Sequence, residues 1–467
     1  MRLPNRSCSR QPGPSLTAQC LAMLVAMFAS LVCAAPASAQ SLIRDAEIED
    51  TLRAYSDPLL KAADLDPKDV DIYIVQDPSL NAFVSGGQNM FFHTGLILAA
   101  ETPNQLKGVI AHETGHIAGG HLARARAAQS QAMIPAFVSI GLGVLALAAG
   151  AGDAGAALIA GSQQFAMASY VRHTQVEEST ADQMAVSLLE ETGQSPEGLI
   201  EFFNRQFRQY EFAQRRVPPY LLTHPLTSDR IQALRSRTET SRFNGVKDSP
   251  EDLHRFAMMH AKLRGFLNEP GRTFRDYPMS DTSLPARYAR AVAAYRVPDT
   301  GQAVRETQAL IAAEPNNPYF HELLGQILFE SGKSADSVAP YRKAVALAPN
   351  APLLQVGLAR SIIAAQGESG AAEAIGMLQK AVSIEPDNAF AWRELANAYA
   401  TAGDDAMAKL STAEEAFAIG NYPRARYFSE IAKKALKPGT TAFRRASDIA
   451  LAAENAVRVA ERGRGRS

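Results

Sequence analysis

Cysteine is almost absent from this 467-residue chain, and its few copies lie in one short segment. Cys8, Cys20 and Cys33 are all three of them, so the chain beyond residue 33 contains none. That part of the chain therefore forms no disulfide. Any zinc ion there must be held by histidine and carboxylate side chains.

An excess of positive charge is missing as well. The chain has 47 lysines and arginines against 48 aspartates and glutamates, which argues against a nucleic-acid partner. With 46% hydrophobic and 20% charged residues the composition is that of a globular protein, and the length is enough for two or three domains.

Acidic residues are absent from the first 44 positions. This segment has three early arginines, an apolar run over 20–35 and small residues at 37–39, the order typical of a secretory signal peptide. We predict that residues 1–39 are removed on export to a bacterial periplasm. Cys33 would suit a lipoprotein anchor, but Val32 before it is bulkier than that processing normally tolerates.

The stretch 108–126 contains an H-E-x-x-H motif, His112-Glu113-Thr114-Gly115-His116. On a helix, side chains four residues apart lie on one face, about 6 Å from each other. Both imidazoles can then reach one zinc ion, and the glutamate between them can reach a zinc-bound water. We predict one zinc ion per chain, with His112 and His116 as ligands and Glu113 as the catalytic base.

A third ligand must be a histidine or a carboxylate farther along the chain. His121 lies one residue short of the spacing used in metzincins, and on a helix this offset turns the side chain by about 100°, so we interpret it as structural. Glu178 and Asp182 share one face of a predicted helix. Glu178 is the predicted ligand, and Asp182 is predicted to accept a hydrogen bond from a ligand imidazole. Glu177 is the alternative ligand.

Four further residues are candidates for stabilising the oxyanion of a tetrahedral intermediate: Tyr170, Arg172, His173 and His224. His224 precedes Pro225 in a loop-like segment. Two interpretations of His224 carry equal weight. It could occupy the open zinc position and keep the enzyme idle until substrate arrives, or it could be a loop histidine that caps the following helix.

The segment before the motif changes its apolar period. Residues 41–70 have helical spacing, whereas 71–76, 82–85 and 89–93 have the pattern of strands. We therefore expect a small antiparallel sheet before the motif helix. Its edge could accept an extended peptide as an added strand.

The segment after the motif contains a long uncharged run. Residues 127–152 contain no charged side chain, and we expect 133–171 to form an apolar hairpin packed over the site or a flap that touches the membrane surface. A two-helix membrane hairpin is a third interpretation. A single crossing is excluded, because His116 and Glu178 lie on either side of the run and must meet at one zinc ion.

The second half of the chain repeats itself. Pro315, Pro349 and Pro386 lie 34 and 37 residues apart, each after an alanine-rich amphipathic stretch and before another helical one. The pattern resembles tetratricopeptide repeats, which are helical hairpins of 34 residues. Weaker flanking units are expected at 284–317 and 405–450. Such a solenoid usually binds a partner segment in its groove, and a spacer or dimer surface is the alternative.

These patterns predict a mainly α protein: a zincin-type α+β metallopeptidase domain with a small antiparallel sheet, followed by an α-helical repeat solenoid. The expected parts are a signal peptide (1–39), a peptidase domain (40–245), a helical linker (246–283), a repeat domain (284–455) and a basic tail (456–467).

The motif pair also resembles a known family. HETGH at 112–116 with ESTAD at 178–182 is similar to the zinc endopeptidases of the HtpX and CAAX prenyl protease group. Segment 81–97, Thr223-His224-Pro225 and the repeats extend this resemblance, over nearly the whole mature chain, to the beta-barrel assembly-enhancing proteases.

The resemblance implies a periplasmic zinc endopeptidase that cleaves misfolded or stalled outer-membrane proteins. It also implies that the repeats bind these substrates or the barrel-assembly machinery, with peripheral membrane contact as a further expectation. The alternative function is a chaperone or assembly factor for outer-membrane beta-barrel proteins with little proteolysis. A third hypothesis, an adaptor with a relict metal site, is disfavoured by the intact motif residues.

Overall fold

The computed structural model describes residues 41–121, 124, 174–213, 220 and 224–464. The predicted signal peptide, the apolar segment 133–171 and three oxyanion candidates, Tyr170, Arg172 and His173, lie outside these residues. Within the described residues no helix has the length and apolar character needed to cross a membrane.

A four-stranded sheet with the order β1-β2-β4-β3 lies at the base of the peptidase part. Its strands are β1 (Leu42–Ile43), β2 (Ile72–Val75), β3 (Ala82–Ser85) and β4 (Asn89–His93). β3 and β4 are antiparallel, joined by a turn at Gly86 and Gly87, whose φ angles of 63° and 111° suit glycine. β2 instead runs parallel to β4, with Ile72 opposite Met90.

The prediction of a wholly antiparallel sheet is therefore wrong for β2. The hairpin inserts its second strand, β4, between β2 and β3, so β2 and β3 are neighbours in the sequence but not in the sheet. Local alternation of apolar residues predicts that a strand exists, but its partner depends on long-range packing.

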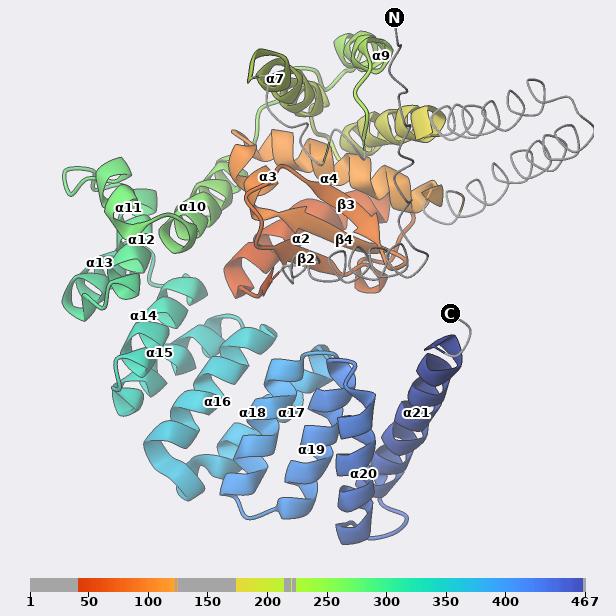
Figure 1. Ribbon diagram of the computed structural model, residues 1–467. Helices are drawn as coiled ribbons and strands as arrows, with labels where there is room; N and C mark the ends of the chain where they lie inside the picture. Colours follow the sequence, from red (N-terminus) through yellow and green to blue (C-terminus); the bar gives the residue numbers. More distant parts are fainter. Residues whose placement is uncertain (1–40, 122–123, 125–173, 214–219, 221–223, 465–467) are drawn as a thin grey trace, which may run out of the picture. The chain divides into compact units, whose positions relative to one another are not determined.

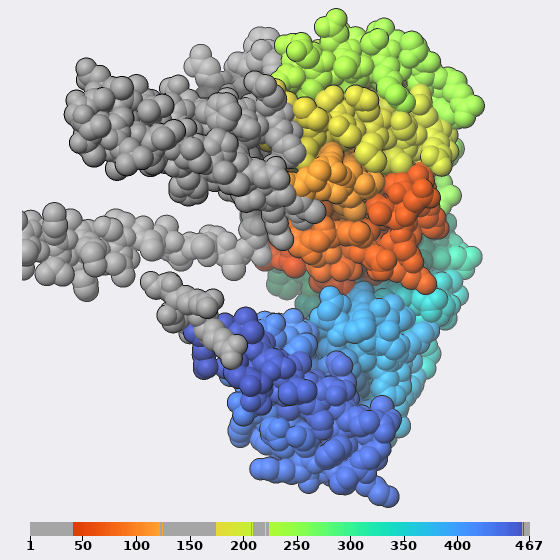
Figure 2. All heavy atoms as spheres, turned by 90° about the vertical axis from the view of Figure 1, so that its right-hand side faces the viewer, coloured from red at the N-terminus to blue at the C-terminus, as the bar shows by residue number. Residues whose placement is uncertain are grey.

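Helices cover the sheet and form the rest of the peptidase part. They are α2 (Ala46–Ala62), α3 (Thr94–Ala99), α4 (Pro103–Ala118), the helix of residues 174–191, α7 (Glu197–Ala213) and α9 (Ser228–Glu239). Both ribbon and space-filling views place the H-E-x-x-H helix α4 between the sheet and the helix of residues 174–191 (Figures 1 and 2).

Glycines let α4 approach its neighbours closely. A Cβ atom at Gly108 would lie 2.8 Å from the Leu199 backbone of α7, and one at Gly115 would lie 2.9 Å from the Ala181 carbonyl oxygen. Both distances are too short for a real side chain. The small residues of α4 thus bring the two helices that carry His112, His116 and Glu178 into direct contact.

The predicted helix start at Ser249-Pro250 is confirmed in α10 (Pro250–Leu267), which Ser249 caps by accepting a hydrogen bond from the Asp252 backbone N–H. Phe256 and Met259 of α10 belong to the hydrophobic core of the peptidase part. Met258 of the same helix belongs to the first core of the repeats. The linker helix therefore contributes to both cores.

Helical hairpins follow from residue 270 to residue 464 (Figure 1). Their helices are α11 (Pro270–Asp276), α12 (Leu284–Arg296), α13 (Thr300–Ala313), α14 (Pro318–Glu330), α15 (Ser334–Leu347), α16 (Pro352–Gln366), α17 (Ala371–Ile384), α18 (Ala389–Thr401), α19 (Asp405–Ala418), α20 (Tyr422–Ala435) and α21 (Thr441–Arg464). The repeated prolines all lie in turns between helices, as the period predicts. Because α21 continues to Arg464, much of the predicted basic tail is helical.

Tyr341 of α15 shows how adjacent repeats pack. A Cβ atom at Gly325 of α14 would lie 2.5 Å from its ring, and one at Gly357 of α16 would lie 2.4 Å from it. The ring fills the space that two glycines leave on neighbouring helices. Substitution of either glycine would force the hairpins apart.

Candidate metal centre

Four side chains converge in the peptidase part and could hold a metal ion. His112 and His116 come from α4, Glu178 from the helix of residues 174–191, and His224 from the segment before α9. Each offers one ligand atom, and these atoms lie within 4.8 Å of one another. His112, Glu178 and His224 are buried, at 0%, 2% and 6% exposure.

The distances between these atoms suit a small cation. His112 Nε2 and His116 Nε2 are 3.2 Å apart, and His116 Nε2 lies 3.3 Å from Glu178 Oε1. His224 Nδ1 lies 3.1 Å from Glu178 Oε1 and 3.4 Å from His112 Nε2. A tetrahedral zinc ion with bonds of about 2.1 Å separates its ligand atoms by about 3.4 Å, so these four distances are close to those of zinc ligands.

Asp182 lies one turn beyond Glu178 and makes the predicted contact with a histidine of the motif. Its Oδ1 atom is 3.0 Å from His112 Nδ1, on the side of the ring away from the cluster. A proton on Nδ1 therefore leaves Nε2 free to bind a metal ion.

Arg230 of α9 also belongs to the site, although no sequence pattern predicted a role for it. Its Nε and Nη2 atoms donate to the two carboxylate oxygens of Asp182 at 2.7 and 2.9 Å, and its Nη1 atom lies 3.0 Å from Glu178 Oε2. Such a two-pronged contact holds both carboxylates in place. No spacing rule indicates Arg230, because its helix packs on the site only through the tertiary fold.

Glu113 is buried beside the cluster, with 1% of its surface exposed. Neither of its carboxylate oxygens has a hydrogen-bond partner among the described residues. Oε1 lies 3.6 Å from His224 Nε2. A buried carboxylate that accepts no hydrogen bond is costly, and a water or substrate at the cluster would supply one, so the donor set fits a catalytic metal site.

Strong electrostatic interactions link these groups. Burial would lower the pKa of His112, but hydrogen bonds to Asp182 and Glu178 outweigh it and raise the pKa to about 9. Burial would raise the pKa of Glu178, but the His224 ring and the hydrogen bonds from His112 hold it well below its usual range. The carboxylates that favour a protonated histidine would equally attract a metal cation.

The remaining candidates have other surroundings. Glu177, the alternative ligand, does not join the cluster, and its Oε1 atom lies 3.8 Å from Arg124 Nε. The helix-capping interpretation of His224 is wrong, because the Thr227 side chain caps α9 by accepting from the Arg230 backbone N–H. Tyr220, which the sequence did not indicate, packs its ring 4.7 Å from that of His224.

An H-E-x-x-H helix crossed by a second helix that supplies a buried glutamate defines a metalloprotease, and this chain is one. Its peptidase part, residues 44–238, matches peptidase family M48. The resemblance stated from the motifs is thereby confirmed.

Several relatives extend the similarity into the repeats. The beta-barrel assembly-enhancing protease of Yersinia pestis is 28% identical over 385 residues, which cover 77% of each chain. That of Escherichia coli K12 is also 28% identical, over 386 residues. The metalloprotease LoiP of Escherichia coli K12 is 27% identical over 188 residues, 39% of this chain and 66% of LoiP.

Among solved structures the similarity is low. The tetratricopeptide-repeat protein YrrB is 16% identical, with a TM-score of 0.31, over 38% of this chain and 91% of that chain. The hairpins of this chain have the helix lengths and the period of such repeats in their own right.

Proposed function

We propose that this chain is a zinc-dependent endopeptidase in which His112, His116 and Glu178 hold one zinc ion and Glu113 is the catalytic base. The observation that carries the proposal is the carboxylate of Glu113, which is buried beside the ligand cluster and accepts no hydrogen bond from the described residues. His₂Glu is a donor set of catalytic zinc sites, because it leaves a fourth position for water or substrate.

Bound zinc would polarise the scissile carbonyl and lower the pKa of a water at the fourth position. Glu113 accepts the proton of the attacking water and later delivers it to the leaving amine. Asp182 keeps the proton of His112 on Nδ1, and Arg230 holds Asp182 in the orientation that this requires.

We also propose that His224 takes the fourth position and keeps the enzyme idle until substrate displaces it. Its Nδ1 atom lies as close to Glu178 and His112 as a fourth ligand would. His224→Ala should retain zinc and cleave an unfolded substrate faster than the wild-type chain. Unchanged basal proteolysis in this variant would contradict the idle state.

The biological role that we propose is quality control of outer-membrane proteins in the periplasm. The support is the similarity to beta-barrel assembly-enhancing proteases over 77% of the chain. The repeat domain, proposed as residues 284–455, would bring misfolded or stalled outer-membrane proteins to the zinc site or bind the barrel-assembly machinery. Peripheral membrane contact of the peptidase domain, residues 40–245, belongs to the same proposal.

A second candidate is a chaperone or assembly factor with little proteolysis. It is favoured by the extent of the solenoid, whose helices α12 to α21 run from residue 284 to residue 464. In cells that lack the wild-type chain, Glu113→Gln separates the two functions. Loss of outer-membrane assembly in the variant means that proteolysis is required, whereas full assembly means that binding suffices.

The direct test is zinc content and casein cleavage of purified residues 40–467, wild type beside Glu113→Gln. We expect about one zinc ion per chain in both and cleavage only in the wild type, with a loss of about 100-fold or more in the variant. A wild-type chain without zinc would overturn the ligand assignment. Zinc without cleavage in either protein would direct attention to His224.

A further inference from the structure

His121 lies just beyond the end of α4, where the sequence alone indicates no role. Its ring is 97% buried and folds back onto the motif helix. His121 Nδ1 is 2.8 Å from His116 Nδ1, and the two rings meet edge to face with centroids 4.9 Å apart. The contact is on the side of His116 opposite to the metal cluster, since His116 Nε2 faces Glu178.

Two glycines allow the His121 ring to lie against His116, each for a different reason. Gly120 has a φ of +63°, the left-handed conformation that ends α4 and favours glycine. Gly119 has φ −67° and ψ −14°, which any residue adopts. Residue 119 must be glycine for lack of space, because a Cβ atom there would lie 2.5 Å from His121 Nε2 and 2.8 Å from His121 Cδ2. The turn is therefore built around the histidine ring.

The direction of the hydrogen bond follows from the chemistry of a ligand histidine. To bind a metal ion through Nε2, the His116 ring must carry its proton on Nδ1. That N–H points at His121 Nδ1, which can only accept it if the His121 proton is on Nε2. The contact is thus compatible with one tautomer of each ring.

We propose that His121 is a positioning residue for the metal centre, whose Nδ1 atom accepts the His116 Nδ1 proton and aims His116 Nε2 at the metal ion. The inference rests on the proposed function, in which His116 is a zinc ligand. The two motif histidines are then anchored differently. A carboxylate, Asp182, holds His112, and an uncharged imidazole holds His116.

The test compares two substitutions at the same position. His121→Phe fills the volume of the ring without an acceptor, whereas His121→Asn places an amide oxygen where Nδ1 now lies. We expect the Phe variant to bind zinc about 10- to 100-fold more weakly, the usual effect of removing a partner of a metal ligand, and the Asn variant to recover most of the affinity. Zinc affinity is measured by competition with a chromogenic chelator.

Two further readouts separate positioning from packing. The visible absorption of the cobalt-substituted protein should change in the Phe variant and remain close to wild type in the Asn variant. Gly119→Ala should reproduce the Phe variant, because its Cβ displaces the ring of His121. His260→Phe is the matched control, a 93%-buried histidine on α10 that packs on Phe256 and should leave zinc affinity unchanged.

Equal zinc affinity and cobalt spectra in the wild-type and Phe variants would overturn the proposal. Equal loss in the Phe and Asn variants would also overturn it, since the ring would then act through its volume alone. A wild-type chain that binds no zinc marks a different failure, that of the proposed function itself. Thermal unfolding of the metal-free proteins shows whether each variant is folded.

Discussion

The metal centre can be compared with another cluster of buried ionisable side chains among the described residues, around Lys262 of α10. In the metal centre, His112, His116, Glu178 and His224 converge, and the only arginine paired with these groups among the described residues is Arg230, 3.0 Å from Glu178 Oε2. In the second cluster the chain supplies its own cation. Lys262 Nζ lies among three carboxylates.

The second cluster links the peptidase part to the repeats. Lys262 of α10 is 2.7 Å from Asp45 Oδ2, 3.3 Å from Glu47 Oε2 and 3.9 Å from Glu322 Oε2 of α14. Glu47 also accepts a hydrogen bond from the Tyr288 hydroxyl of α12. Helices from both halves of the chain therefore share one buried network.

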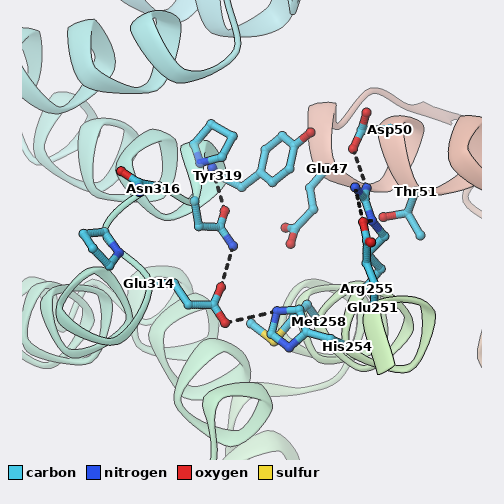
Figure 3. A pocket seen from close by; sticks show the side chains of 13 residues that line it. Glu47, Asp50, Thr51, Glu251, His254, Arg255, Met258, Glu314, Asn316 and Tyr319 are labelled. Carbon is cyan, nitrogen blue, oxygen red and sulfur yellow. Dashed lines mark hydrogen bonds and ion pairs between the residues drawn. The ribbon is translucent and has the colours of Figure 1, made fainter. Parts of the chain in front are cut away.

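A pocket of about 550 Å³, drawn in Figure 3, shares Glu47 with this network. Glu47 and Asp50 of α2 line it together with His254 and Arg255 of α10 and Glu314 after α13. Arg255 pairs with Asp50 at 2.8 Å, and His254 pairs with Glu314 at 3.2 Å. The two clusters thus differ in their groups: three imidazoles and a carboxylate converge in the metal centre, whereas one lysine and three carboxylates converge at the junction.

The largest predicted effect comes from substituting two adjacent glutamates, one inside the metal centre and one outside it. Glu178→Ala should lose zinc and lower the proteolytic rate by more than about 100-fold, beyond the range for partners of a ligand, because it removes a ligand. Glu177→Ala is the matched control and should retain zinc, since Glu177 lies outside the cluster. Metal analysis and casein cleavage measure both. Loss of zinc in the Glu177 variant alone would exchange the two assignments.

The second largest predicted effect is a loss of folding stability when the buried lysine of the junction is substituted. Lys262→Met leaves three carboxylates without their cation and should lower the free energy of unfolding by about 3–5 kcal/mol, with zinc content unchanged. Urea unfolding measures the loss. The control is Lys409→Met, whose exposed pair with Asp405 should contribute less than about 0.5 kcal/mol. A Lys262 variant as stable as wild type would show that the network does not hold the junction.

The smallest effect is a dependence of stability on pH. Burial raises the pKa of Glu322 to about 8, with Lys262 opposing this change and Asp45 and Glu47 adding to it. Between about pH 4.5, the ordinary pKa of glutamate, and pH 8, Glu322 keeps its proton in the folded chain but releases it in the unfolded chain. The contribution of this proton to the free energy of unfolding is therefore complete below pH 4.5 and is lost as the pH rises to about 8. Glu322→Gln should flatten the slope of the urea midpoint over this window. An identical slope in both proteins would contradict the assignment.

Local patterns predicted much of the fold and part of the site. The i, i+4 spacing places His112 with His116 and Glu178 with Asp182 on helix faces, whatever the rest of the chain does. Helix caps and turn prolines act within a few residues of the chain, so helix boundaries such as that at Ser249 were predictable. The 34-residue period predicted the hairpins for the same reason.

Contacts between distant segments were not predictable in this way. The parallel pairing of β2 with β4 and the clamp of Arg230 on Asp182 join residues far apart in the chain. For His224 the sequence left two interpretations open, and the tertiary fold brings it into the cluster. His121 is an intermediate case. It is five residues from His116, but its contact requires a left-handed residue, Gly120, which a continuous helix excludes.

The amino-acid sequence by itself determined which chemistry this protein can perform, because metal-ligand residue types and their spacing on single helices are local properties. Only the tertiary structure decided how the ligands are oriented and which charges surround them. Burial of carboxylates, imidazoles and a guanidinium in one volume depends on which helices pack together, and helix packing is a property of the whole peptidase part.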